Sequence, residues 1–261
     1  ANLANRHDTI GQCLVNHCVN DILVIGAKPL FFLDYFAAGK LDNDILENVI
    51  KGFSIACKEN KCVLIGGETA EMPGFYDGKK YDVSGTVIGV VEKDNMLSNR
   101  KTSKGDILIG LPSSGLHTNG YSLARKVLLD KYEIGSKIDY LGCSVDEELL
   151  KIHKSYLHIL SPILNKPWLK ALSHITGGGL IENIHRVLEK NQDVKIDWSS
   201  WQWPNIFKLI QEEGNIKFDD MVRPFNLGIG MVLVVNKTNL KDLEAYLNEA
   251  NQTYFQIGEV I

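Results

Sequence analysis

Apolar and polar residues follow two different periods in the first third of the chain. Between Thr9 and Leu23, apolar residues recur about every four positions, which predicts a mostly buried helix. The run at residues 29–37 (PLFFLDYFA) predicts a strand, and residues 44–60 carry the apolar stripe of an amphipathic helix. Short apolar runs at 62–67 (CVLIGG) and 81–93 (YDVSGTVIGVVEK) predict two further strands.

Polar, turn-forming residues from Asp94 to Asp106 interrupt this pattern and predict a domain boundary. We expect an N-terminal domain at residues 1–97 and a C-terminal domain at residues 98–261. In the second part strands again alternate with helices, including one long helix expected at about Val145–Leu164. We therefore expect an α/β (α+β) fold with two domains, in which the helices of the C-terminal domain pack on a mixed sheet.

The composition restricts the class of protein. Of 261 residues, 44% are hydrophobic and 23% are charged, which is typical of a globular protein. A net charge of -4 without a basic stripe argues against nucleic acid as a partner. No apolar run approaches the roughly 20 residues that cross a bilayer, so we expect no membrane partner. The five cysteines are an odd number without a C-x-x-C pair, so we expect reduced thiols in a cytoplasmic protein.

Asp21 is the first candidate for chemistry because it stands beside Asn20 in a helix whose neighbouring positions are nearly all apolar. A buried carboxylate without a partner costs several kcal/mol, so it needs a cation, a metal or several donors. We favour a metal ligand; the alternative is a solvent-facing acid near the C-terminal end of the helix. Asp8, just before the helix, is a weaker candidate because N-capping explains it better.

Glu68 is the second acid of interest, because it follows Gly66 and Gly67 directly after an apolar run. Ligand sites in α/β folds open at the carboxyl ends of strands, and glycines there let a backbone or a phosphate approach. A carboxylate supplies the hard oxygen that Mg²⁺ prefers. An ordinary turn with surface acids is the alternative, and it describes Glu71 better than Glu68.

Two loops offer donors for a phosphorylated small molecule. In the segment LPSSGLHTNGYSL the hydroxyls, an amide and an imidazole stand close together, although helix capping alone explains Asn119. In the segment HITGGGLIENI the glycines predict free backbone N–H groups at a helix N-terminus, although a tight connection is an equal alternative. His117 and His174 are the candidates for proton transfer. The expected phosphate-binding residues are Ser113, Ser114, Gly115, Asn119, Thr176, Gly177, Gly178 and Gly179.

Several familiar catalytic patterns are missing from the sequence. Gly115 and Gly120 have the spacing of a phosphate-binding P-loop, but Tyr121 stands where its lysine belongs. There is no nucleophile elbow, no H-E-x-x-H and no G-x-G-x-x-G after a strand, so covalent hydrolysis, zinc peptidase and nicotinamide chemistry have no support.

Seven segments, taken together and in order, resemble the aminoimidazole ribonucleotide synthetase family, also called phosphoribosylformylglycinamidine cyclo-ligases. The match extends over essentially all 261 residues, and several segments are long enough to be specific. The segments are RHDTIG, CVNDILVIGAKPLFFLDYFAAGKL, GGETAEMPGFY, YDVSGTVIGVVE, LPSSGLHTNGYSL, HITGGGLIENI and SSWQWP.

The resemblance implies a homodimer in which strands from the N-terminal domains of both subunits form a β-barrel. It implies an ATP- and Mg²⁺-dependent ring closure that converts formylglycinamidine ribonucleotide to 5-aminoimidazole ribonucleotide, ADP and phosphate in purine biosynthesis. Related superfamily members place metal-binding acids at positions like Asp21 and Glu68. The expected ATP and magnesium site therefore comprises Asp8, Asn20, Asp21, Gly66, Gly67 and Glu68.

The sequence departs from the family at its start. The family normally begins earlier, with a glycine-rich segment and a strand ending in a motif of Asp-Gly-Val-Gly-Thr-Lys type that contacts ATP. Neither stands before Ala1, so we expect the N-terminal domain to lack its first strand and the chain as printed to bind ATP poorly. Two alternative functions stay open, a small-molecule kinase of the same superfamily and a non-catalytic dimeric assembly subunit.

Overall fold

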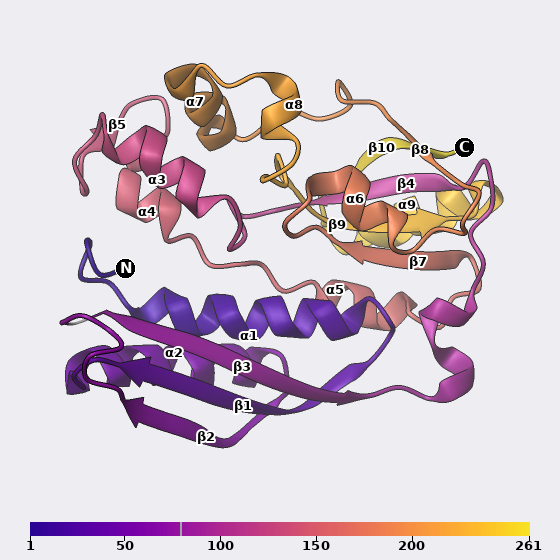
Figure 1. Ribbon diagram of the computed structural model, residues 1–261. Coiled ribbons are helices and arrows are strands. Elements are labelled where there is room, and N and C mark those ends of the chain that lie inside the picture. The colour runs from indigo at the N-terminus through magenta and orange to yellow at the C-terminus, as the bar shows by residue number, and fades with distance from the viewer. Residues whose placement is uncertain (79) are drawn as a thin grey trace.

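The computed structural model describes residues 1–78 and 80–261, which form two layered regions joined by a connecting segment (Figure 1). The first region consists of α1 (Asp8–Leu23), β1 (Lys28–Ala38), α2 (Asn43–Glu59), β2 (Val63–Glu71) and β3 (Tyr81–Val90). Its three-stranded sheet has the order β2-β1-β3, with β1 and β2 parallel and β1 and β3 antiparallel. Both helices pack against one face of this sheet.

The apolar pattern of the sequence supplies the core between these layers. Phe32 and Phe36 of β1 and Val15 of α1 are at most 1% exposed. The two helices cross in close contact, since a Cβ placed on Gly11 would lie 2.3 Å from the carbonyl oxygen of Val49. The other face of the sheet is open, because the residues of β3 alternate between half-buried and exposed along the whole strand.

A five-stranded sheet organises the second region. Its strands are β4 (Ile107–Pro112), β7 (Leu169–His174), β8 (Val194–Ile196), β9 (Ile229–Val235) and β10 (Phe255–Val260). Their order is β7-β9-β4-β10-β8, and every neighbouring pair is antiparallel. The prediction of a mixed sheet in the C-terminal domain is therefore wrong, because this sheet is entirely antiparallel. The sheet of the first region is the mixed one. Alternation of strands and helices in a sequence does not fix strand direction, because helical connections can also join antiparallel strands.

Apolar clusters cover both faces of this sheet, and every residue of β9 is buried. The helices are α3 (Tyr121–Leu129), α4 (Val145–Leu149), α5 (Leu157–Leu160), α6 (Gly179–His185), α7 (Asn205–Gly214), α8 (Phe218–Met221) and α9 (Leu240–Glu249). The smaller elements are β5 (Lys137–Ile138), β6 (Cys143–Ser144), and the 3-10 helices η3 (Ser161–Ile163) and η4 (Lys237–Asn239).

The long helix expected at Val145–Leu164 is wrong. α4 ends at Leu149, α5 begins at Leu157, and residues 150–156 between them cross toward α1 without helical structure. We call residues 150–156 the crossing segment, and its contacts with α1 explain its conformation.

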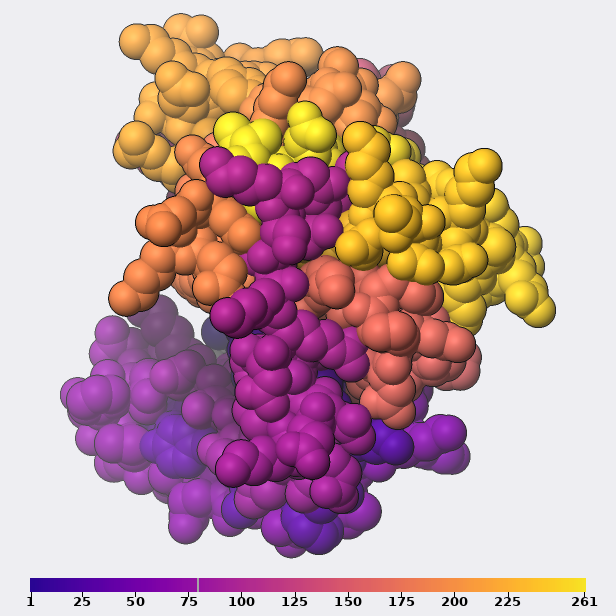
Figure 2. Space-filling model, turned by 90° about the vertical axis from the view of Figure 1, so that its right-hand side faces the viewer, coloured from indigo at the N-terminus to yellow at the C-terminus, as the bar shows by residue number. Residues whose placement is uncertain are grey.

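The connection between the two regions contains η1 (Lys93–Asn95) and η2 (Leu97–Asn99). It runs over the surface from the first region to the second, as the magenta chain in Figure 2 shows. The guanidinium of Arg100 fixes its end by donating to the carbonyls of Leu164, Lys166 and Leu169. None of the helices in the described residues has both the length and the apolar character needed to span a membrane.

Candidate functional site at the junction of the two regions

A polar stripe of α1 holds the crossing segment by its backbone. Asn20 is fully buried, and its Nδ2 donates to the carbonyl of Lys154 (2.8 Å) while its Oδ1 accepts the N–H of Tyr156 (3.0 Å). One turn earlier, Nδ2 of Asn16 donates to the carbonyl of His153 (2.8 Å). These bonds satisfy backbone groups that a helix would otherwise pair, so the segment stays non-helical. Asn20, expected at the nucleotide, instead has both ends of its amide occupied by this backbone.

Three histidines from different elements meet beside this stripe, and we call them the histidine cluster. His17 comes from α1, His153 from the crossing segment and His174 from the end of β7, with ring centres 5.1–5.3 Å apart. The Nε2 atoms of His153 and His174 are 3.0 Å apart. Asp21 contacts two of the rings, with Oδ1 2.8 Å from Nδ1 of His174 and Oδ2 3.4 Å from Nε2 of His17. The carboxylate thus belongs to the histidine cluster.

Asp21 does not occupy the buried position expected for it. Its side chain is 52% exposed, which matches the alternative of a solvent-facing acid near the end of the helix. Partial burial raises the pKa of Asp21, but the hydrogen bond and charge of His174 and the charge of His17 lower it by more, so it lies below its usual value. Burial lowers the pKa of His17 and holds that of His153 well below its usual range. At neutral pH the ionised carboxylate of Asp21 therefore stands beside the neutral imidazole of His17.

His117 lies behind the cluster, stacked on His153 with ring centres 4.0 Å apart. Its Nε2 accepts the backbone N–H groups of Ser114 (3.0 Å) and Lys154 (3.2 Å), and the residue is 2% exposed. Burial lowers the pKa of His117 to about 3, so the ring stays neutral. A buried, neutral ring that joins two backbone segments is a positioning residue, which argues against the expected proton transfer by His117.

The glycine loop after β7 differs from the expected row of free amides. The N–H of Gly178 donates to the carbonyl of Arg223 (3.1 Å), and the N–H of Gly179 donates to the carbonyl of Thr176 (3.2 Å). Within the described residues, no hydrogen bond engages the N–H of Gly177. The expected phosphate-binding row of three amides is therefore reduced to the amide of Gly177.

Asn183 of α6 fixes the shape of this loop. Its Nδ2 donates to the carbonyls of Thr176 (3.3 Å), Gly177 (3.2 Å) and Gly179 (2.7 Å), and its Oδ1 accepts the hydroxyl of Thr176 (3.1 Å). The hydroxyl of Thr176 is thus occupied as well. The sequence analysis did not single out Asn183. Its position four residues after Gly179 was the available signal, because residues four apart lie on the same face of a helix.

In the loop after β4, most side chains that were expected to bind phosphate form hydrogen bonds within the protein instead. Ser113 donates to Oδ1 of Asn226 (2.9 Å), Ser114 donates to a carbonyl of the crossing segment, and Asn119 donates to the carbonyl two residues before it (2.8 Å). Gly115, with φ of 154°, makes the turn between them. The alternative role of Asn119 as a helix cap is wrong, because Gly120 is the N-cap of α3.

The two loops lie side by side next to the histidine cluster. A Cβ placed on Gly177 would lie 3.4 Å from Oδ1 of Asn119. The hydroxyl of Thr118 lies 3.1 Å from Nδ1 of His153, and His174 leads directly into the glycine loop. The structure therefore brings together both expected phosphate loops and both candidate catalytic histidines, His117 and His174.

Glu68 lies on the other side of the first sheet. β2 continues to Glu71, and Glu68 pairs in register with Tyr35, which by strand alternation faces away from the helices. With Gly66 and Gly67 it lines a shallow hollow of about 560 Å³ on the open face. Asp21 stands on α1, beyond the opposite face, so one chain does not form the expected joint metal site of Asp21 and Glu68.

Asp8 does not join Asp21 either. It is the first residue of α1, and His7 occupies the N-cap position that was expected for Asp8. Thirteen residues at about 1.5 Å each put the two acids roughly 20 Å apart along the helix.

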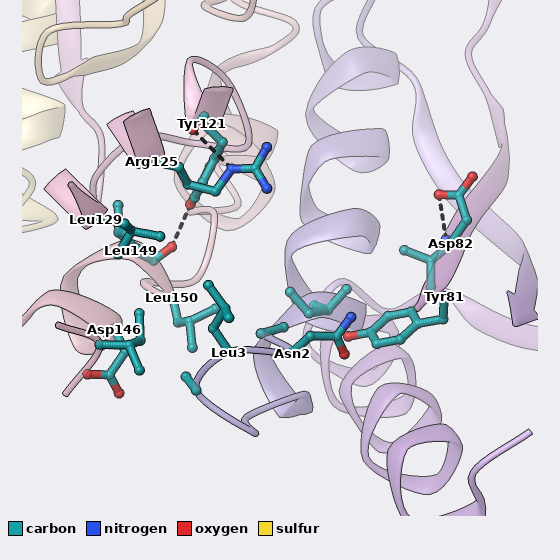
Figure 3. A pocket seen from close by; sticks show the side chains of 15 residues that line it. Asn2, Leu3, Tyr81, Asp82, Tyr121, Arg125, Leu129, Asp146, Leu149 and Leu150 are labelled. Carbon is teal, nitrogen blue, oxygen red and sulfur yellow. Dashed lines mark hydrogen bonds between the residues drawn. The ribbon is translucent and has the colours of Figure 1, made fainter. Parts of the chain in front are cut away.

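A separate cleft of about 350 Å³ opens between the two regions near the N-terminus (Figure 3). Tyr81 and Asp82 lie on one side of it, and Tyr121, Arg125 and Leu149 lie on the other. In the part of the chain that the structure describes, none of the expected site residues lines this cleft.

Comparisons with known proteins define the class. The family model "AIR synthase related protein, N-terminal domain" matches residues 1–91, and the corresponding C-terminal domain matches residues 103–261. The fold is similar to E. coli HypE, a hydrogenase maturation protein (TM-score 0.70, 18% identity, 96% of this chain and 73% of that chain). It is also similar to thiamine-monophosphate kinase from Stenotrophomonas maltophilia (TM-score 0.69, 17% identity, 98% and 76%). The chain is thus an AIR synthase related protein.

Curated relatives identify the family within this class. Phosphoribosylformylglycinamidine cyclo-ligases of Citrifermentans bemidjiense and Alkaliphilus metalliredigens are 50% and 44% identical over 260 and 261 residues. Each match covers 99% of this chain and 75% of the relative. The chain belongs to the phosphoribosylformylglycinamidine cyclo-ligase family. It is a ligase with a role in purine biosynthesis, which confirms the resemblance seen in the sequence.

Proposed function

We propose that the protein converts formylglycinamidine ribonucleotide and ATP to 5-aminoimidazole ribonucleotide, ADP and phosphate. The observation that carries this proposal is the meeting of the two polar loops with His174, in a chain of the cyclo-ligase family. HypE, whose structure was solved in complex with ATP, shares the fold (TM-score 0.62, 16% identity, 96% of this chain), which supports ATP as the phosphoryl donor.

The chemistry requires activation of the formyl amide oxygen. ATP transfers its γ-phosphoryl group to this oxygen and leaves as ADP. The amidine nitrogen of the substrate then attacks the formyl carbon, the carbon–oxygen bond breaks, and phosphate leaves as the ring closes. Much of the catalytic effect comes from positioning, which can contribute about 7–11 kcal/mol when the reacting atoms are held together.

The loops and His174 have separate roles in this proposal. The amide of Gly177, next to Asn119, binds the ribose phosphate of the substrate, and Asn183 keeps the glycine loop in shape for it. His174, oriented by Asp21, accepts the proton released when the amidine nitrogen closes the ring. Ser113, Ser114 and the remaining loop glycines shape the loops.

Glu68 and the hollow beside Gly66 and Gly67 are proposed to receive the nucleotide. Mg²⁺ is commonly held by one or two carboxylates together with phosphate oxygens, and Glu68 fits the role of a single carboxylate. When bound, the ion would offset negative charge on the phosphates. Since the first sheet and α1 separate Glu68 from the loops within one chain, we propose that a second copy completes the site.

Product mass tests the reaction. The purified protein is incubated with formylglycinamidine ribonucleotide, ATP and Mg²⁺, and the expected product is lighter than the substrate by one water. A product heavier by one phosphoryl group would favour the small-molecule kinase. If the substrate and ATP both stay unchanged, the result would favour the non-catalytic assembly subunit.

Glu68→Gln tests the nucleotide site. Loss of the carboxylate charge should reduce kcat/KM by about 100-fold, or about 2.7 kcal/mol, and raise the Mg²⁺ concentration needed for half-maximal rate. Glu47→Gln, at an exposed acid of α2, serves as the matched control and should behave like the wild type. Full turnover by Glu68→Gln with an unchanged Mg²⁺ dependence would contradict the assignment.

We also propose that the open face of the first sheet forms a homodimer, with strands of both copies in one barrel. One end of this face carries exposed apolar residues that a monomer would leave in water. Phe31 pairs in register with both Val63 and Ile88, so their side chains are adjacent. The exposed apolar residues are Phe31 (39%), Val63 (55%), Ile65 (52%), Ile88 (45%) and Val90 (53%).

Ile88→Lys should convert the dimer to a monomer, because it places a charge in the apolar part of the interface. Sedimentation equilibrium measures the outcome. Ile55→Lys is the control, since Ile55 is similarly exposed (37%) but lies on α2, on the side away from this face. An unchanged dimer in Ile88→Lys would place the interface elsewhere.

We propose a domain division at residues 1–97 and 98–261. It is supported by the position of the two sheets, because β3 ends at Val90 and β4 begins at Ile107. We propose a cytoplasmic location, which the free thiols of all five cysteines support.

A further inference from the structure

We propose that His17, His153 and His174 bind one transition-metal dication, with Zn²⁺ as the expected ion. Each ring offers one ligand atom, and these atoms all lie within 4.8 Å of one another. The ring centres form a nearly equilateral triangle with sides of 5.1, 5.1 and 5.3 Å. Zn–N bonds of about 2.0–2.1 Å at tetrahedral angles put three imidazole centres roughly 5 Å apart around one ion.

The contact between two of the rings also fits a shared ion. Nε2 of His153 and Nε2 of His174 face each other at 3.0 Å. Two nitrogens bound to one tetrahedral zinc lie roughly 3.3 Å apart, so a small outward movement of the rings suffices. Both nitrogens then direct their lone pairs at the ion.

The outer nitrogens of two of the three rings already have the hydrogen-bond partner that metal-binding histidines need. Nδ1 of His174 contacts the carboxylate of Asp21 at 2.8 Å, and Nδ1 of His153 contacts the hydroxyl of Thr118 at 3.1 Å. Hydrogen bonds of this kind fix the tautomer and orientation of a ligating imidazole. The second carboxylate oxygen of Asp21 also lies 3.4 Å from Nε2 of His17, at ion-pair distance. Asp21 therefore hydrogen-bonds one proposed ligand and lies beside a second.

The third ring distinguishes a metal site from a hydrogen-bonded pair. A direct N–H···N bond explains the contact of His153 with His174, but it gives no role to His17. Nδ1 of His17 is a buried atom that has no hydrogen-bond partner among the described residues. An ion would satisfy the unpartnered nitrogen.

The ligand set indicates the kind of ion. Imidazole nitrogens suit Zn²⁺, Ni²⁺ and Cu²⁺, whereas Mg²⁺ prefers oxygen ligands. Three protein ligands leave a fourth position for water or a substrate atom. The side chain of Asp21, beside the cluster, is 52% exposed, so solvent reaches the edge of the cluster. The histidine cluster thus differs in its ligand chemistry from the magnesium site proposed at Glu68.

An ion bound here would occupy Nε2 of His174. If His174 acts as the base, as the proposed function has it, Zn²⁺ would inhibit ring closure because the lone pair is no longer available. This inhibition depends on the proposed function. Metal binding itself does not depend on it, because it is measured without nucleotide or substrate.

Cobalt binding tests the site in the metal-free protein. After EDTA treatment and dialysis, Co²⁺ is titrated without nucleotide, and we expect one equivalent to bind with the intense visible absorption of four-coordinate cobalt. Zn²⁺ should displace it. A near-ultraviolet thiolate band would instead indicate binding by cysteines. His17→Gln and His153→Gln should each weaken binding at least 100-fold, and Asp21→Asn about 10-fold to 100-fold.

His158→Gln is the matched control, because His158 is exposed in α5 and lies outside the cluster. Its affinity for Co²⁺ should equal that of the wild type. Circular dichroism verifies that each variant is folded. Should the buried variants fail to fold, the exposed Asp21→Asn decides by losing most of the Zn²⁺-dependent rise in Tm. Equal cobalt affinity in Asp21→Asn and in folded His17→Gln, or six-coordinate spectra in the wild type, would overturn the proposal.

Discussion

Replacing Asn20 by alanine should lower the free energy of unfolding by about 2–6 kcal/mol, because it leaves two buried backbone groups without partners at about 1–3 kcal/mol each. These groups are the carbonyl of Lys154 and the N–H of Tyr156. A whole domain is stable by only about 5–15 kcal/mol, so this one amide accounts for a large share.

Urea denaturation followed by circular dichroism measures the effect. Asn48→Ala is the matched control, since Asn48 is exposed on α2 and its amide bonds only the carbonyl of Asp44. A loss below about 1 kcal/mol for Asn20→Ala would mean that water replaces the amide without cost, and that the crossing segment is held by other contacts.

Gly11→Ala should also destabilise the protein, by about 2–4 kcal/mol, although alanine is the better helix former by about 1 kcal/mol. The added Cβ would lie 2.3 Å from the carbonyl oxygen of Val49 and 2.5 Å from the backbone nitrogen of Phe53. Both obstacles are backbone atoms, so α1 and α2 must move apart and the core between them must loosen.

Differential scanning calorimetry measures this change as a lower Tm. Ser54→Ala is the control, because Ser54 is exposed on α2 and faces no such contact. A wild-type Tm for Gly11→Ala would show that the two helices can separate at no cost, contrary to the close packing described.

Local patterns predicted the first region well. The expected helix at Thr9–Leu23 is α1 at Asp8–Leu23, and the expected strand at 29–37 is β1 at Lys28–Ala38. These elements bury one clear apolar face, so their period survives in the sequence. The crossing segment was misread because its conformation depends on Asn16 and Asn20, which lie more than 130 positions away in the chain.

The site was predicted less well, for physical reasons that particular residues show. Asp21 looked buried from its apolar neighbours, but it faces solvent beside His17 and His174. The amides of Gly178 and Gly179 looked free, but their acceptors come from other turns of the chain. His153 carried no local signal at all, since its neighbours in the cluster are set by tertiary structure. Motif resemblance, by contrast, does not depend on such contacts, and it identified the family.

The bonds between α1 and the crossing segment restrict how this enzyme can move. Asn16, Asn20 and Asp21 of one half are bonded to backbone or rings of the other half, at the centre of the molecule. A hinge opening between the halves would break all of them together. Breaking them together has a high cost, so we expect substrate exchange to depend on local movement of the loops after β4 and β7 more than on a hinge motion between the halves.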